Sequence, residues 1–394
     1  MSPVLALDLG TTKVTCAVGQ PLAVPISSLG WTHQPLAVQL LGCGMAAYPT
    51  LTPGMGQTHL MAQAIEEAVA ASGMTTPLDR AVVAVTHPAL AHACIDAQIE
   101  VADEPATIRA HELNRLRRQA ISQALGLDRD VLLLEGLNYS GNGFDHIVDP
   151  YGLCATRLRG QFHFITLPQA IRQSIMLALE AAGLELDRLS YTLKSLTSAS
   201  WSLGNDVRRA PEAVSERTLI VDIGGSCTDA ALVQSDRILR ASTVAVGGLT
   251  VLEEVAKACH LQADHALTAS LEGFTSQKPT VRKLVERALR PLHELLHGVL
   301  QQEVPPVLTI VTGRGAMIDG IVEWIETLTG IKTVLGRHAL AKPLGDVSQQ
   351  LAFTPVLALL ENVCRRPEPR SSSRSARLFS RVVDRTKRIL VEYF

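Results

Sequence analysis

Asp8-Leu9-Gly10-Thr11-Thr12-Lys13 and Asp222-Ile223-Gly224-Gly225-Ser226-Cys227-Thr228-Asp229 are two glycine-rich stretches with the same chemistry at distant points of one chain. Each follows a short apolar run, carries an acid just before glycine, and continues into a second apolar run, at residues 14–18 and 230–233. Such a turn presents backbone N–H groups and hydroxyls to phosphate oxygens, while its carboxylate can orient a hydrated divalent cation. The pair predicts two β-hairpins whose turns close on one polyphosphate from opposite sides.

Length and composition set the class of protein. A chain of 394 residues is long enough for two or more domains with sizeable cores. Hydrophobic residues make up 47% and charged residues 19%, which is typical of a globular protein. The net charge of -2 gives no reason to expect binding to nucleic acid.

The cysteines and the N-terminus indicate the compartment. The 7 cysteines are scattered and form no C-x-x-C pair, a pattern typical of reduced thiols in the cytoplasm. The N-terminus enters a strand with no basic and then apolar leader, which predicts no signal peptide. No apolar run approaches the ~18 residues that span a bilayer. We therefore expect any contact with a membrane to be peripheral.

Strand-like runs alternate with amphipathic helices through most of the chain, as in α/β proteins. The expected helices cover residues 60–72, 168–182, 251–260 and 281–301, with Pro291 kinking or dividing the last one. From about residue 81 to residue 163 strands predominate, apart from a charged helix at 111–125. This change of character predicts an inserted small domain.

A third glycine turn follows the strand expected at residues 307–311. It has the sequence Thr312-Gly313-Arg314-Gly315-Ala316. Glycines here would let a nucleoside approach the backbone closely. The alternative, a strand-to-helix turn that binds nothing, stays open on this stretch alone.

The C-terminal residues change character again. Residues 365–376 are rich in Arg, Ser and Pro and predict a flexible linker. Large apolar residues then recur at spacings of three and four, and basic residues lie between them: Leu378, Phe379, Val382, Val383, Arg385, Lys387, Arg388, Ile389, Leu390 and Phe394. Each basic side chain near an anionic leaflet contributes about 1 kcal/mol, so residues 377–394 predict a membrane-binding helix. The alternative is a terminal helix that packs on its own domain.

In this order along the chain, the motifs resemble the FtsA family of bacterial cell-division proteins, within the actin-like ATPase superfamily. The resemblance covers nearly the whole length: residues 5–14, the inserted segment, residues 222–229, 246–248 and 312–316, and the amphipathic end that closes on phenylalanine. It implies an α/β fold of the actin-like ATPase type, with two duplicated halves around a nucleotide cleft.

The resemblance also implies a division of the chain. The first half would comprise residues 1–80, completed by 164–195 and about 335–364, with the FtsA-type insert at 81–163. The second half would comprise 196–248, completed by 305–334, and its small subdomain would be 249–304. The linker at 365–376 and the membrane helix at 377–394 complete this division.

ATP and Mg²⁺ are the implied cofactors. Asp8 and Asp222 would orient the hydrated metal. The implied nucleotide-binding residues are Gly10, Thr11, Thr12, Lys13, Gly224, Gly225, Ser226, Gly247, Gly248, Gly313, Arg314 and Gly315. The first four would contact phosphates from one side, and the residues of the second turn would contact them from the other.

The implied partners follow from the family. They are further copies of the chain in a filament, the anionic cytoplasmic face of the inner membrane at the division site, the C-terminal peptide of FtsZ and other divisome proteins. Basic residues that could receive an acidic peptide are Arg282, Lys283, Arg287 and Arg290. A solvated helix face explains the same charges equally well.

Several positions depart from the family pattern. Ser226 and Cys227 stand where Gly-Thr is usual, Arg314 replaces a glycine, and Lys194 stands where many members have Glu. The segment between Glu272 and Val281 is short for a hairpin that the FtsZ-binding subdomain usually has. We therefore expect nucleotide binding, with at most a slow ATPase activity.

Two other functions remain open. An actin-like assembly protein of type IV pilus machines would lack a tethered basic helix. A small-molecule kinase of the superfamily would need a substrate pocket with a positioned carboxylate base.

Overall fold

The computed structural model describes residues 3–22, 38–48, 57–75, 78–199, 203, 217–301 and 304–365. The predicted linker, except Arg365, and the predicted membrane helix at 377–394 lie outside the described residues. Across the described ranges, no helix is both long enough and apolar enough to cross a bilayer.

The first predicted hairpin forms and starts a five-stranded sheet. Its strand β1 (Val4–Leu9) pairs antiparallel with β2 (Lys13–Pro21), which pairs antiparallel with β3 (Val38–Ala47). On the other side β1 pairs parallel with β4 (Arg80–Val85), and β4 pairs parallel with β11 (Glu185–Tyr191). The sheet order is β11-β4-β1-β2-β3.

The second sheet repeats this topology strand for strand. The predicted hairpin of β12 (Arg217–Ile223) and β13 (Thr228–Gln234) continues antiparallel to β14 (Arg237–Val244). On its other side β12 pairs parallel with β15 (Leu308–Thr312), which pairs parallel with β16 (Thr333–Leu335). In the order β14-β13-β12-β15-β16, strand β12 takes the central place that β1 has in the first sheet, with the same parallel and antiparallel neighbours. The chain therefore contains two duplicated halves.

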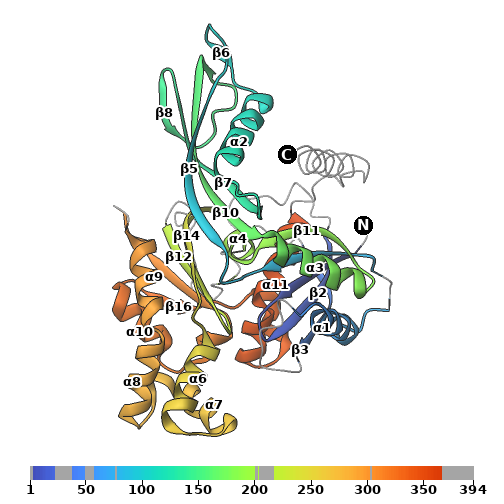
Figure 1. The fold of residues 1–394 in the computed structure, drawn as a ribbon, viewed down its shortest axis with the longest axis vertical. Coiled ribbons are helices and arrows are strands. Elements are labelled where there is room, and N and C mark those ends of the chain that lie inside the picture. The colour runs from blue at the N-terminus through green and yellow to red at the C-terminus, as the bar shows by residue number, and fades with distance from the viewer. Residues whose placement is uncertain are drawn as a thin grey trace, which may run out of the picture.

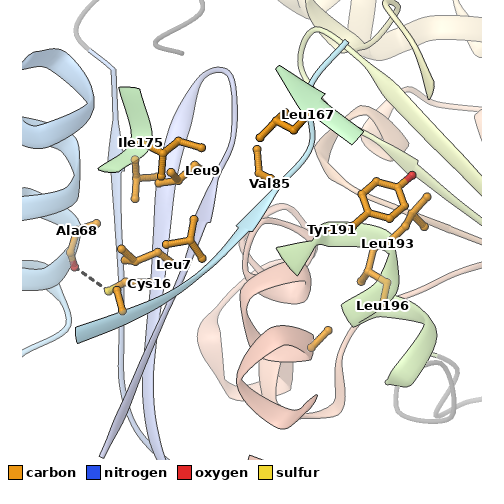
Figure 2. Close-up of a cluster of buried hydrophobic side chains, with 14 of the residues drawn as sticks. Leu7, Leu9, Cys16, Ala68, Val85, Leu167, Ile175, Tyr191, Leu193 and Leu196 are labelled. Atoms are coloured by element: carbon orange, nitrogen blue, oxygen red, sulfur yellow. Dashed lines mark hydrogen bonds between the residues drawn. The ribbon is translucent and has the colours of Figure 1, made fainter. Parts of the chain in front are cut away.

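Helices cover both faces of the first sheet. On one face α1 (Thr58–Ala71) and α3 (Gln169–Ala181) pack against Leu7, Leu9 and Cys16, whose Sγ donates to the Ala68 carbonyl at 3.0 Å (Figure 2). On the other face lies α11 (Val347–Arg365), preceded by the 3-10 helix η5 (Ala339–Leu344). Because both faces are covered, β1 is almost continuously apolar rather than alternating.

The helices of the second half form their own core with one face of its sheet. They are α6 (Gly248–Cys259), α7 (Ala263–Glu272), α8 (Pro279–Ala288), α9 (Arg290–Leu300) and α10 (Ile321–Thr329), with short 3-10 helices η3 (Gly273–Thr275) and η4 (Arg314–Met317). The helix predicted at 281–301 is divided at Leu289, because Pro291 lacks the N–H that would continue α8. Figure 1 shows α6, α7 and α8 at the end of the molecule opposite the insert.

The two halves share one continuous core. The short helix α4 (Thr192–Ser198) buries Leu193 and Leu196 completely between the sheets (Figure 2). Ile220 of β12 and Ile310 of β15 belong to the same cluster as Leu7 of β1. The apolar contacts that stabilise the two sheets are therefore common to both halves.

The inserted domain projects from one end of the molecule (Figure 1). It has a separate four-stranded sheet in the order β5-β10-β7-β8, a two-stranded ribbon β6-β9, and its own core. Its elements are β5 (Ala91–Glu100), β6 (Ala106–Thr107), α2 (Ala110–Ala124), β7 (Arg129–Gly141), β8 (Phe144–Ile147), β9 (Cys154–Ala155) and β10 (Arg157–Pro168). The charged helix predicted at 111–125 is α2.

The start of the insert needs a correction. The sequence predicts an insert that begins at residue 81, but β4 pairs with β1 in the first sheet. All of β4 except Arg80 is buried, and an apolar run of this kind fits a central strand of either sheet equally well. The separate sheet begins only at Ala91.

Polar contacts join the insert to both halves. Lys194 of α4 places its Nζ 2.5 Å from Glu135 Oε1 of β7. The other oxygen of Glu135 accepts from the Ile238 N–H of β14 at 3.0 Å, and Arg237 donates to the Leu137 carbonyl at 2.6 Å. Lys194, which departs from the family pattern, therefore has a structural partner in this chain.

Candidate functional site

The first glycine turn is a tight hairpin turn. The Gly10 N–H donates to the Lys13 carbonyl at 3.1 Å, and a Cβ at Gly10 would lie 3.1 Å from that oxygen. Thr11 is buried, and Lys13 Nζ donates to the Ala352 carbonyl of α11 at 3.5 Å. The turn thus holds its hydroxyls and its amine at the end of β1.

The second turn reproduces this geometry. The Gly224 N–H donates to the Cys227 carbonyl at 2.9 Å, and a Cβ at Gly224 would lie 2.9 Å from it. Because β12 occupies the place in its sheet that β1 occupies in the other, the two turns are equivalent points of the duplicated halves.

The tips of the two turns touch. A Cβ at Gly225 would lie 2.8 Å from Thr11 Oγ1 and 3.1 Å from Thr12 Cγ2. Residues more than two hundred positions apart therefore meet without an intervening side chain. The structure brings together the two glycine-rich turns, and their role in phosphate binding stays a prediction.

The start of α6 supports the second turn from behind. The Gly248 N–H donates to the Gly224 carbonyl at 2.9 Å, and the Leu249 N–H donates to the Gly225 carbonyl at 2.8 Å. A Cβ at Gly247 would lie 2.5 Å from each of these carbonyl oxygens. Two amides of the first turn of α6 are therefore already used to hold the second turn.

The predicted nucleoside turn packs on the end of β12. Gly313 has a φ of +80, and a Cβ there would lie 2.4 Å from Asp222 Oδ1. A Cβ at Gly315 would lie 2.3 Å from the side chain of Ile223. Glycine is needed at both positions because the backbone approaches β12 so closely. Arg314 between them is exposed.

Two buried carboxyl groups flank the turns. Burial raises the pKa of Asp8 to about 6, although the Lys13 charge opposes the rise. Burial, with the charges of Asp229 and Asp8, raises the pKa of Asp222 to about 8. Burial also lowers the pKa of Lys13 to about 8, against the attraction of Asp8. The site therefore concentrates acidic groups that a cation would stabilise in their charged form.

Asp229 has a role that the sequence analysis did not assign. It is completely buried and lies directly opposite Asp222 in the pairing of β12 with β13. Its Oδ2 accepts from Thr86 Oγ1 at 2.6 Å, just after β4, and its Oδ1 accepts from Thr243 Oγ1 of β14. Asp229 thereby bridges the two halves behind the second turn. The sequence feature that could have predicted this role is the position of Asp229 at the end of the second glycine-rich stretch.

The residues present fit a phosphate group with a divalent cation. Ser226 Oγ and Thr312 Oγ1 are buried hydroxyls with no hydrogen-bond partner in the part of the chain that the structure describes. Phosphate oxygens would accept hydrogen bonds from them. The described residues contain no group of three or more His, Cys, Asp or Glu that could hold a metal alone. A cation beside Asp8 and Asp222 would therefore depend on phosphate oxygens and water for its remaining ligands.

The basic residues considered for peptide binding lie on the surface of α8 and at the start of α9. Arg282 donates to the Ser276 carbonyl at 3.1 Å, and Arg287 Nη2 lies 2.5 Å from Glu254 Oε2. Arg290 Nε lies 3.7 Å from Glu294 Oε1. Lys283 is exposed, and none of the described residues forms a hydrogen bond or an ion pair with its amine.

Comparison with known proteins agrees with this arrangement. Residues 92–166 match the family described as the SHS2 domain inserted in FtsA, which covers the insert from β5 to β10. The chain is 23% identical over 390 residues to the cell division protein FtsA of Pseudomonas aeruginosa, covering 91% of this chain and 88% of the relative. It is 22% identical to FtsA of Neisseria meningitidis serogroup B, covering 91% and 89%.

Among solved structures, the PilM-PilN type IV pilus biogenesis complex is similar, with a TM-score of 0.66 and 15% identity over 93% of this chain and 99% of that chain. At this identity the likeness concerns the fold. The duplicated sheets, with an acid-glycine turn at the end of the central strand of each, have the actin-like fold.

Within proteins of this fold, the SHS2 insert and the similarity over nearly the whole length point to one family. Over nearly its whole length the chain is similar to cell-division proteins of the FtsA family, and its insert matches the SHS2 domain described as inserted in FtsA.

Proposed function

We propose that the chain binds Mg-ATP between the turns at Asp8–Lys13 and Asp222–Asp229. The contact of Gly225 with Thr11 and Thr12 carries this proposal, because it puts the two acid-glycine turns tip to tip. A phosphate group can enter only if the tips move apart. Nucleotide binding would therefore change the relation of the two halves, which suits a switch for assembly better than fast turnover.

Substitution of Asp222 tests the nucleotide site. Asp222→Ala should weaken Mg-ATP binding about tenfold or more, since a charge-assisted contact to a cation or its water is lost. Asp187→Ala, at an exposed acid of β11, is the control. Isothermal titration with and without Mg²⁺ measures both variants. Equal Mg-ATP affinity in Asp222→Ala and the wild type would mean that the metal role is misassigned.

The proposed place of action is the cytoplasmic face of the cell membrane at the division site. The basic amphipathic segment 377–394 supports this, and further copies of the chain would assemble there as a filament. Deleting residues 377–394 should abolish sedimentation with anionic liposomes and leave the residual binding to zwitterionic liposomes unchanged. Undiminished binding to anionic liposomes would overturn the membrane role.

The proposed partner at the membrane is the acidic C-terminal peptide of FtsZ, received by the basic surface of α8. Lys283 carries most of this proposal, because the other three basic groups already have contacts within the chain. Lys283→Glu should lower the affinity for the peptide several-fold, whereas Lys332→Glu, on an exposed loop, should not. Fluorescence anisotropy with a labelled peptide compares the two, and an equal effect would rule out this surface.

A role in type IV pilus assembly is the second candidate. The TM-score of 0.66 to the PilM-PilN complex favours it at the level of the fold. This role needs no membrane helix at 377–394, so the liposome experiment separates the two functions.

A further inference from the structure

A cavity of about 330 Å³ lies where the insert meets the second half, away from the two glycine turns. Strand β5 and β10 of the insert form one wall, and β14 and α9 form the other, in the region where β5, β14 and α9 converge in Figure 1. Its polar wall residues are His92, Cys94, His163, Arg240, Ser242 and Glu294. This volume is in the range of small-molecule sites.

His163 is an unsatisfied polar group in this wall. Its side chain is 2% exposed, and neither ring nitrogen has a hydrogen-bond partner among the described residues. Burial lowers the pKa of His163 to about 3, so the ring is neutral, with one N–H donor and one acceptor. Buried polar groups are normally paired, and a ligand in the adjoining cavity could supply the partner.

Arg240 supplies the positive charge. Its Nη1 donates to the Gly298 carbonyl at 3.0 Å, at the end of α9, and no carboxylate in the described ranges is paired with the guanidinium. The carboxylate in the wall, Glu294, lies 3.7 Å from Arg290 instead. A guanidinium with free N–H groups binds the oxygens of carboxylates or phosphates.

The tautomer of His92 adds a second requirement. Thr243 Oγ1 donates its single proton to Asp229, so it must accept from His92 Nε2, which lies 2.8 Å away. His92 Nδ1 is then a buried acceptor, and it has no partner in the described part of the chain. It requires a donor such as a hydroxyl.

We propose that this cavity binds a small oxyanion that also carries a hydroxyl group, either a hydroxycarboxylate or a hydroxylated phosphate ester. The oxyanion pairs with Arg240 and with the N–H of His163, and the hydroxyl donates to His92 Nδ1. The site lies on the insert and the second half and does not use the nucleotide-binding residues.

The same contacts link the cavity to the two glycine turns. His92 is hydrogen-bonded to Thr243, Thr243 is hydrogen-bonded to Asp229, and Asp229 lies opposite Asp222. A ligand that moves His92 therefore changes the support of Asp222. Binding at the two sites is coupled, and the coupling must be reciprocal.

Histidine NMR resonances of the full chain without nucleotide test the site. Titration with malate and with glycerol 3-phosphate, at constant ionic strength, should shift the His92 and His163 resonances saturably. One of the two probes will bind more tightly and so identify the oxyanion. Succinate, which is malate without its hydroxyl, should bind about tenfold more weakly. No saturable shift with either probe, or equal affinity for malate, glycerol 3-phosphate and succinate, would overturn the proposal.

His163→Phe keeps the shape of the ring and removes both nitrogens. It should weaken the preferred probe about tenfold, whereas His59→Gln, on the exposed surface of α1, should leave its affinity unchanged. Arg240→Lys keeps the charge but not the planar fork of the guanidinium, and should also weaken binding of the preferred probe. This variant replaces His163→Phe in the test if His163→Phe does not fold. Wild-type affinity in these two cavity variants would contradict the site.

The coupling has its own measurement and rests on the proposed nucleotide function. The saturating probe should change the Mg-ATP affinity of the wild type by at least about five-fold. Thr243→Val, measured at a probe concentration that again saturates the cavity, should lose this change. If the chain binds no ATP, the nucleotide function fails while the histidine titration still decides the cavity. If ATP binds and the probe has no effect on it, the coupling is wrong.

Discussion

At the scale of single residues, Gly247 is a position where the site leaves no room for a side chain. A side chain there would meet two backbone carbonyls of the second turn at 2.5 Å, and backbone cannot move aside as a flexible side chain can. Gly247→Ala should lower the free energy of unfolding by about 1–3 kcal/mol. It should also weaken Mg-ATP binding, because the displaced carbonyls belong to Gly224 and Gly225. Chemical denaturation and nucleotide titration measure the two effects.

Gly298→Ala is the matched control for this prediction. A Cβ at Gly298 meets nothing within 4 Å, and the residue lies inside α9. Alanine should leave the stability unchanged or raise it by about 0.5–1 kcal/mol. Similar losses in both variants would show a general sensitivity to substitution rather than close backbone approach.

The buried histidines predict sensitivity to acid. Burial lowers the pKa of His92 to about 4 and that of His163 to about 3, from an ordinary value of 6.5. Below pH 6.5 the unfolded chain takes up protons that the folded chain does not, so stability is complete above pH 6.5 and is lost as the pH falls. Each histidine contributes up to about 1.4 kcal/mol per pH unit. Arg240 strengthens the effect at His163, because its charge opposes protonation.

Between pH 6.5 and about pH 4 the stability of His163→Phe should therefore fall less than that of the wild type. The difference is the contribution of one histidine, up to about 1.4 kcal/mol per pH unit. Besides Arg240, the charge of His92 also opposes protonation of the His163 ring. His59→Gln, at an exposed position, should keep the wild-type slope. An unchanged slope in His163→Phe would assign the acid sensitivity to other groups.

Residue identities predicted part of the site. Asp8, Asp222 and the glycines could be found because acid-glycine turns after apolar strands have a local chemical logic. The bridge from Thr86 to Asp229 could not, since it joins residues 143 positions apart and depends on how the two halves pack. The unsatisfied rings of His92 and His163 likewise become visible only when β5 and β10 are placed against β14.

At the scale of elements, the hairpins and most helices follow from local pattern. The two hairpins and the helix α2 form where the sequence predicts them, because turn chemistry and amphipathic spacing are local properties. The sheet to which β4 belongs was predicted wrongly. Its pairing with β1 and β11 is non-local, and a fully apolar strand does not specify its neighbours.

Helix α11 is anchored by a buried polar cluster. His338 Nε2 lies 2.7 Å from Glu361 Oε2, and Arg365 Nη2 lies 2.6 Å from Glu361 Oε1. The Leu340 N–H donates to His338 Nδ1, so His338 donates to Glu361 through Nε2. Glu361 is 1% exposed, accepts a hydrogen bond from His338 and forms an ion pair with Arg365.

Removal of this carboxylate should loosen α11. Glu361→Ala removes the acceptor of the buried His338 N–H and the carboxylate beside the Arg365 guanidinium, and should cost about 3–5 kcal/mol of stability. Glu180→Ala, at an exposed position of α3, should cost less than about 0.5 kcal/mol. Thermal unfolding of the two variants gives the comparison. A loss in Glu361→Ala no larger than in Glu180→Ala would mean that apolar packing alone holds the helix.

At the scale of the whole molecule, duplication explains why one site is built from two distant motifs. Equivalent strands β1 and β12 end in equivalent turns, and α4 packs between the sheets so that the turns meet. The order of the motifs therefore predicted the class of fold. The position of the insert against the second half depends on contacts of Glu135, Arg237 and His92, and no sequence motif predicts these contacts.

The hydrogen bond from Thr86 to Asp229 should control how firmly the halves are held together. It joins the end of β4 to β13 at 2.6 Å and ends on a completely buried carboxyl group. Thr86→Val keeps the shape and removes the donor, so it should cost about 1.5–3 kcal/mol, as expected for a hydrogen bond to a charged group.

The matched control is Thr15→Val. Thr15 is fully buried, whereas Thr86 is half-buried, and the Thr15 hydroxyl has no partner among the described residues, so valine there should be neutral or stabilising. Denaturation gives both stabilities, and Mg-ATP titration should show weaker binding only in Thr86→Val, because Asp229 supports Asp222 from the opposite strand. Equal behaviour of the two variants would mean that the apolar core around α4, rather than this bond, sets the relation of the halves.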